Sequence, residues 1–189
     1  GLREGFHEYV YRGKLLVMRS ILASEVTMLA HMLHHLSQTN RWYRDFTLNA
    51  LEKALREVIA CFAVYRSYIS PGAEGSPEDS RLILRAIVTA RRRNPDLERT
   101  VFEFLRDVLV PPQDSSHPVD EDARREFVLR FQQSTGPITA KGVEDTAFYV
   151  YNRLVALNEV GGEPSCFGSD VAEFHKRNAE RLAAHPHSL

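Results

Sequence analysis

The chain has 189 residues, and its 43% hydrophobic content can fill the core of one domain or of two small ones. Its 24 basic and 25 acidic residues are interspersed and give a formal net charge of −1, which argues against a nucleic-acid or anionic-membrane partner. Cys61 and Cys166 lie far apart without CxxC spacing, which argues against a zinc site or a disulfide framework and fits a reducing cytoplasm.

The N-terminal stretch "GLREGFHEYVYRG" begins with Gly rather than Met and lacks the apolar core of a signal peptide. We therefore expect a piece of a larger protein. No apolar run approaches the roughly 18 residues that a membrane span needs, so no membrane partner is expected.

Residues 20 to 37 and 47 to 62 each place apolar side chains at steps of three and four, which predicts two amphipathic helices. We expect these helices to pair through the short connection "QTNRWYRD". No run alternates with period two for long enough to be a strand, so the predicted fold class is an all-α, multi-helix domain.

Further helices are predicted after two turn-rich breaks. Ser76 and Pro77 have the cap and first-turn proline of a helix start, and this helix should run to Asn94. The chain restarts at Pro95, and the proline-rich linker "VPPQDSSHPVDED" precedes a helix that carries Phe127 and Phe131.

A last helix, with Val171, Phe174 and Leu182 on its apolar side, should end near His185-Pro186. We divide the chain into residues 1–134, a helical domain, and residues 135–189, a helix, a glycine-rich loop and the final helix. Both parts could belong to one compact unit.

Two clusters with the spacing of binding sites have simpler interpretations. His31, His34 and His35 have the i, i+3, i+4 spacing of metal ligands, but no nearby carboxylate or thiolate completes a set, so no metal is expected. The arginines at 91–93 fall in the last turn of a helix, where the dipole favours cations, and a solvated helix end is favoured over nucleic-acid binding.

The stretch "CFAVYRSYISPG" ends an apolar helix with Tyr65, Arg66 and Tyr68. Two rings beside a guanidinium make a surface that could stack on a sugar and hydrogen-bond to it. The alternative, in which both tyrosines close the core with their hydroxyls in water, is equally favoured by these residues alone.

The stretch "GPITAKGVEDTAFYVYNRLVALNEVGGEP" places Lys141, Glu144 and Asp145 before a dense aromatic run that includes Tyr149. The three charged residues have the spacing of ordinary surface ion pairs. However, surface helices seldom hold three aromatics within four residues, and Gly136-Pro137 and Gly161-Gly162 should shape both ends of the stretch sharply. We favour one wall of a binding site.

Long stretches of the chain resemble the maltooligosyltrehalose synthase family, enzymes related to α-amylases. The resemblance is carried, in order, by "SEVTMLAHML", "RDFTLNALEKALREVIACFAVYRSYI", "FQQSTGPITAKGVEDTAFYVYNRLVALNEVGGEP" and "FGSDVAEFHKRN". The chain departs from the family pattern at Ala63, where proline is expected, and at Val150, where arginine is expected.

The resemblance implies a full enzyme that isomerises the reducing-end α-1,4 linkage of a maltooligosaccharide into an α,α-1,1 linkage without a cofactor. It implies an amylase-type (β/α)₈ barrel with a large helical insertion, and this chain would be the insertion and its return to the barrel. Its partners would then be the maltooligosaccharide substrate and the remainder of the same polypeptide, in the cytoplasm.

A retaining transglycosylation needs two carboxyl groups about 5 Å apart on opposite sides of the bond. Glu144 and Asp145 cannot flank a sugar, because neighbours on a helix point roughly 100° apart from one side of it. The family's nucleophile and acid/base precede this region, and its third catalytic aspartate lies in a His-Asp motif that this chain lacks. We therefore expect no catalytic residue here and no turnover by the chain alone.

The resemblance instead implies a substrate-binding role for residues that can hydrogen-bond to sugar hydroxyls or stack on sugar faces. The expected residues are Lys141, Glu144, Asp145, Tyr149, Tyr65 and Arg66. The alternative is a free-standing helical protein-interaction module whose grooves bind a partner helix.

Overall fold

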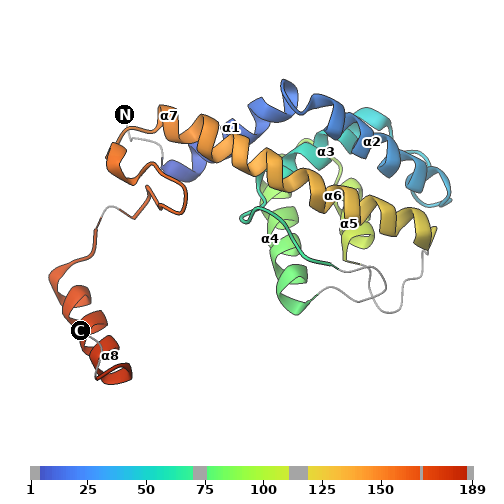
Figure 1. Ribbon diagram of the computed structural model, residues 1–189. Helices are drawn as coiled ribbons and strands as arrows, with labels where there is room; N and C mark the ends of the chain where they lie inside the picture. The colour runs from blue at the N-terminus through green and yellow to red at the C-terminus, as the bar shows by residue number, and fades with distance from the viewer. Residues whose placement is uncertain (1–4, 70–75, 111–118, 167, 187–189) are drawn as a thin grey trace.

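The computed structural model describes residues 5–69, 76–110, 119–166 and 168–186 (Figure 1). All regular secondary structure in these ranges is helical, which confirms the all-α prediction. The α-helices are α1 Phe6–Arg19, α2 Ala23–Gln38, α3 Leu48–Ala60, α4 Pro77–Arg93, α5 Arg99–Leu109, α6 Glu121–Gly142, α7 Phe148–Val150 and α8 Val171–Ala184. A π turn, Val143–Ala147, joins α6 to α7, and a 3₁₀ turn spans Val155–Leu157.

The main core lies where α6 crosses the other helices (Figure 1). α6 packs against α1, α2 and α5, and α3 contacts α1, α2, α4 and α5. The predicted pairing of the second and third helices is therefore confirmed. Phe62 and Phe131 meet edge to face in this core, with ring centroids 6.0 Å apart. Tyr43, in the connection between α2 and α3, packs on Phe104 with ring centroids 4.6 Å apart.

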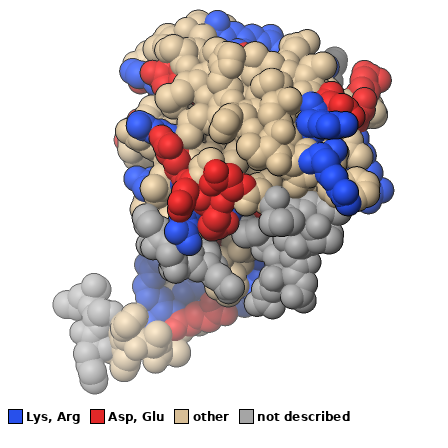
Figure 2. All heavy atoms as spheres, turned by 90° about the vertical axis from the view of Figure 1, so that its right-hand side faces the viewer, with Lys and Arg blue, Asp and Glu red and all other residues tan. Residues whose placement is uncertain are grey.

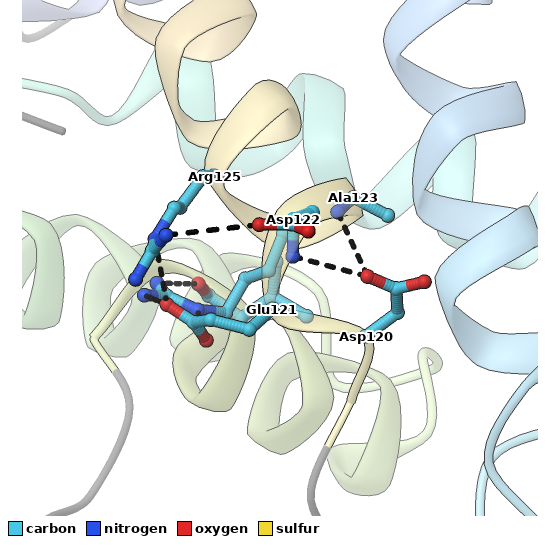
Figure 3. Close-up of polar contacts among 7 residues, drawn as sticks. Asp120, Glu121, Asp122, Ala123 and Arg125 are labelled. Atoms are coloured by element: carbon cyan, nitrogen blue, oxygen red, sulfur yellow. Dashed lines mark hydrogen bonds and ion pairs between the residues drawn. The ribbon is translucent and has the colours of Figure 1, made fainter. Parts of the chain in front are cut away.

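Side-chain caps start four of the helices. Thr47, Ser76, Asp120 and Asp170 each accept a hydrogen bond from a backbone N–H in the first turn of α3, α4, α6 and α8, respectively. Figure 3 shows the cap of α6, where Asp120 Oδ1 accepts from the backbone N–H groups of Asp122 at 3.0 Å and Ala123 at 3.1 Å. The predicted start at Ser76-Pro77 and end at Asn94 of the fourth helix are confirmed.

Charged side chains of both signs lie beside one another at the end of the molecule that carries the start of α6 (Figure 2). Arg124 pairs with Glu121 at 2.6 Å, and on α5 Arg99 pairs with Glu103 at 2.6 Å. These exposed pairs stabilise little individually. Among the described residues of this face, both signs of charge are present.

The sharply shaped start expected at Gly136-Pro137 is not found, because α6 runs through both residues. Proline removes one N–H from the helix and its ring opposes the carbonyl four residues earlier. The helix continues because the residues around it, Thr135, Ile138 and Thr139, are buried against its neighbours. The division of the chain at 134/135 thus falls inside one helix. The turn-rich residues 70–75 and most of the proline-rich linker, 111–118, lie outside the described residues.

Helix α1 has no counterpart among the helices predicted from the sequence, yet its backbone approaches that of α6 very closely. A Cβ added at Gly13 would lie 2.4 Å from the carbonyl oxygen of Gly142, and one added at Gly142 would lie 2.7 Å from Cγ of Lys14. Only glycine allows the two backbones to come this near. The contact sits one residue before the π turn.

The last predicted helix is confirmed as α8, which ends at Ala184 with His185 as its C-cap, but none of its side chains is buried. In Figure 1, α8 lies away from the helical body at the end of the stretch that follows α7. Val171, Phe174 and Leu182, its predicted apolar side, are all more than half exposed. No single helix of the described residues is long and apolar enough to cross a membrane. Helices α1 and α2, bent by 83° at the break between them, have the length and composition of a membrane span only when taken as a pair.

Candidate functional site

A hydrogen bond joins the two stretches that the sequence singled out. The Tyr65 hydroxyl donates to Glu144 Oε1 at 2.5 Å, across 79 positions of sequence. Tyr65 belongs to the irregular segment 62–69 that follows α3, and Glu144 belongs to the π turn after α6. The fold therefore assembles one polar site from both stretches.

The segment 62–69 is held to the helical body near both of its ends. Gln132 of α6 accepts from the backbone N–H of Ile69 at 2.6 Å and donates to its carbonyl at 3.0 Å. At the other end the Phe62 carbonyl accepts from Lys14 at 2.6 Å. Lys14 and Gln132 are both buried, so the path of Tyr65 is fixed from inside the core.

The π turn presents the charged residues of the site. In this turn the backbone bonds run from i to i+5, and π turns inside helices occur often at functional sites. The Thr146 hydroxyl donates to the Lys141 carbonyl, five residues earlier, at 2.8 Å and so gives a partner to a carbonyl in the last turn of α6. The turn places the half-buried Glu144 toward Tyr65 and leaves Asp145 exposed.

Lys141 and Asp145 form the predicted i, i+4 ion pair, with Nζ and Oδ2 2.6 Å apart. About half of each side chain is exposed, 49% and 56%. The hydrogen bond to Asp145 raises the pKa of Lys141, so the amine stays charged at neutral pH. The pair can present a cation and an anion to water or to a ligand's hydroxyl groups.

The bond to Glu144, with some burial, raises the pKa of Tyr65 to about 12. A phenol that donates to a carboxylate is favoured in its neutral form. Tyr65 keeps its ring partly exposed and its hydroxyl oriented at neutral pH. A partly open, oriented ring is suited to contact with a sugar face.

Arg66 and Tyr149 are not joined to this cluster. The Arg66 guanidinium lies over the ring of Tyr68 at 4.9 Å, and Arg66 Nε donates to the Ser67 carbonyl at 3.4 Å. Tyr149 is 84% exposed. No contact among the described residues links it to Tyr65 or Glu144.

The other two aromatics of the run have packing roles. Phe148 stacks on Phe6 of α1 with ring centroids 5.8 Å apart, and Tyr151 is buried with its ring 5.4 Å from that of Tyr9. Together with Ala147 they form a small apolar cluster beneath the π turn. The density of aromatics thus reflects a local core as well as one exposed ring.

Lys14 is the contributor that the sequence analysis missed. Its side chain is 1% exposed, and burial lowers its pKa to about 8. Lys14 follows Arg12 and Gly13 in α1, and neither of these neighbours indicates that its side chain is buried. Only the packing of α1 on α6 shows that it lies under the site.

The remaining candidate clusters take no part. His34 Nε2 lies 3.3 Å from the side-chain amide nitrogen of Gln38. No group of three or more side chains that could hold a metal ion occurs in the described ranges. Arg93 is exposed at the end of α4, as expected, but its guanidinium also pairs with Glu8 at 2.6 Å and lies 3.7 Å over the Tyr11 ring. Helix α4 is tied to α1 by this arginine. Arg92 and Arg93 are both exposed, in keeping with the expected solvated helix end.

Comparison with known proteins finds relatives of this chain in sequence and in fold. A stretch of 64 residues, 34% of the chain, is 53% identical to a protein described as a maltooligosyl trehalose synthase in each of two strains of Mycobacterium tuberculosis. The resemblance to the maltooligosyltrehalose synthase family is confirmed. The matched stretch spans 8% of each of these synthases.

A solved structure, DSM5389 glycosyltrehalose synthase, has a similar fold, with a TM-score of 0.53 and 21% sequence identity. The similarity covers 95% of this chain and 18% of that synthase. Nearly all of the helical arrangement therefore has a counterpart within a much longer synthase chain. No protein-family model matches the chain.

Proposed function

We propose that the chain is a helical segment of a maltooligosyltrehalose synthase and forms a substrate-binding wall for its reaction. In that reaction the reducing-end α-1,4 linkage of a maltooligosaccharide becomes an α,α-1,1 linkage by intramolecular transglucosylation. The observation that carries the proposal is the Tyr65–Glu144 hydrogen bond. It joins two family-like stretches into one polar site that neither could form alone.

The chemistry of the exposed groups fits a polyhydroxylated ligand. Lys141 supplies a donor, Asp145 and Glu144 supply acceptors, and Tyr65 supplies an oriented ring. A glucose unit released from the chain must be held while it turns and attacks again. Directed hydrogen bonds with exclusion of water meet that requirement.

The carboxylates of this wall are unsuited to the bond-making steps. Glu144 and Asp145 are neighbours on one turn, and each already has a partner, Tyr65 and Lys141, respectively. A nucleophile and an acid/base must face each other across the bond. We infer that the catalytic carboxylates lie elsewhere in the polypeptide and that this chain alone does not turn over substrate.

The remainder of the polypeptide is the proposed partner of the C-terminal part. Apolar side chains are exposed along the stretch after the π turn and on α8, among them Val150, Val155, Val160, Val171 and Phe174. Exposed apolar groups gathered in one part of a chain mark surfaces that become covered. The two free cysteines, Cys61 and Cys166, fit the reducing cytoplasm proposed for the enzyme.

Alanine substitutions in the full-length enzyme test the wall. Lys141→Ala, Glu144→Ala and Asp145→Ala should each lower kcat/KM by roughly tenfold to hundredfold, the effect of losing a charged hydrogen bond to substrate. The ratio of free glucose to trehalose-type product should rise, because water intercepts a poorly held glucose. Lys53→Ala, on the exposed face of α3, is the control and should change neither quantity. Normal rates and product ratios in all three folded variants would refute the proposal.

A further inference from the structure

The buried Lys14 contacts both halves of the candidate site. Its Nζ donates to the carbonyl of Phe62, three residues before Tyr65, at 2.6 Å. Its stem lies against Gly142, two residues before Glu144, so closely that a Cβ there would be 2.7 Å from Lys14 Cγ and 2.9 Å from Lys14 Cα. One side chain thus touches the backbones that carry both partners of the Tyr65–Glu144 bond.

A lysine is a costly choice for this position. Burial of an ammonium group is unfavourable unless it is well paired, and no ion pair of Lys14 occurs among the described residues. Lowering of its pKa to about 8 by burial reflects the same cost. An apolar side chain of similar length would fill the space without it. The amine therefore serves its contact with Phe62 rather than the packing.

That contact acts where the backbone is otherwise irregular. The segment 62–69 has no helical ladder, and the buried Gln132 holds it at Ile69. Asp79 accepts from the backbone N–H of Tyr68 at 3.1 Å near the same end, and Lys14 supplies the attachment at the other end, at Phe62. Tyr65 lies between the two attached ends, and its hydroxyl meets Glu144 only if both the segment and the π turn keep their places.

We infer that Lys14 is a positioning residue for the substrate-binding wall: its amine anchors Phe62 and its stem seats Gly142, and together these contacts hold Tyr65 against Glu144. The functional part of this inference rests on the proposed function. The structural part, that Lys14 controls the Tyr65–Glu144 bond, can be measured without turnover.

The structural part is tested by the ionisation of Tyr65 in the full-length protein. Absorbance at the tyrosinate band is recorded against pH for each protein and for the same protein with Tyr65→Phe, and the difference isolates Tyr65. In Lys14→Met the Tyr65 phenol should ionise at lower pH than in the wild type, because it loses its alignment with the Glu144 carboxylate. Val17→Ala, a buried change on the same helix, is the control and should leave the titration unchanged.

An unchanged Tyr65 titration in Lys14→Met, or an equal shift in Val17→Ala, would overturn the inference. If Lys14→Met does not fold, Lys14→Gln removes the buried charge with a milder loss of polarity. The same earlier ionisation is expected there, and its absence would equally overturn the inference.

Kinetics test the functional part through a double-mutant cycle. Lys14→Met should lower kcat/KM for the maltooligosaccharide by about tenfold in the wild-type background and add little further loss in the Tyr65→Phe background. Full additivity would contradict a role through Tyr65. If Tyr65→Phe and Glu144→Ala leave the rates unchanged, the proposed function fails, while the titration still decides whether Lys14 positions Tyr65.

Discussion

Substitution of Gly13 by alanine should destabilise the chain, although alanine is the better helix former. The new Cβ would lie 2.4 Å from the Gly142 carbonyl oxygen and 3.3 Å from both the carbonyl carbon and Thr146 Cγ2. Ordinary contact begins near 3.4 Å, so α1 and α6 must separate by about 1 Å, a gap that forfeits a quarter to a half of each contact energy along the interface.

Overpacking of this kind costs about 1–3 kcal/mol, and the helix propensity of alanine returns about 1 kcal/mol. We therefore expect the free energy of unfolding to fall by up to about 2 kcal/mol. Urea denaturation followed by circular dichroism measures this directly. Separation of the helices should also withdraw Gly142 from Lys14.

Gly136→Ala is the matched control within α6. Nothing lies within 4 Å of a Cβ added there, and the residue is helical. We expect a gain of up to about 0.5 kcal/mol, less than the full propensity difference because the following Pro137 crowds a Cβ. A Gly13→Ala variant as stable as Gly136→Ala would refute the close contact between α1 and α6.

Four further outcomes are expected. In Glu144→Gln the Tyr65 phenol should ionise well below its folded-state pKa of about 12, as a difference titration against Tyr65→Phe would show. In the wild type, the stabilisation from this bond should be complete below the ordinary tyrosine pKa of about 10 and lost as the pH rises through 12, detectable as a falling urea midpoint. Arg93→Ala should lower the free energy of unfolding by about 1 kcal/mol through loss of its ion pair and ring contact, whereas the neighbouring exposed Arg92→Ala should change it by under about 0.5 kcal/mol. Asp170→Ala should weaken α8 by about 1 kcal/mol, seen as faster amide exchange in α8 with no change in the core.

Elements with a regular apolar stripe and a local cap were predictable from the sequence. Helices α2 and α3 show such stripes, and Ser76 with Pro77 marks the start of α4. Helix α1 is different because its buried face contains Gly13 and Lys14, neither of which reads as apolar. The sharp start expected at Gly136-Pro137 was overridden by the tertiary packing of α6.

The same distinction holds for the candidate site. The Lys141–Asp145 pair follows from helical spacing alone, since its members are four residues apart. The Tyr65–Glu144 bond depends on how α3 and α6 are placed, and no local spacing encodes it. Arg66 and Tyr149 had suitable chemistry, but Arg66 contacts Tyr68 and Ser67, and Tyr149 is exposed. Chemistry at single positions was readable, and its assembly in space required the fold.

The π turn at Val143–Ala147 also determines how the chain tolerates a change in its length at this point. An i to i+5 bond holds one residue more than an α turn, so the stretch is equivalent to a one-residue insertion in a continuous helix. Deleting one residue there would restore α-helical register and rotate everything downstream by about 100°, which would carry Phe148 away from Phe6. Related chains shorter by one residue between Gly142 and Phe148 would therefore have to build both this small core and the partner of Tyr65 in another way.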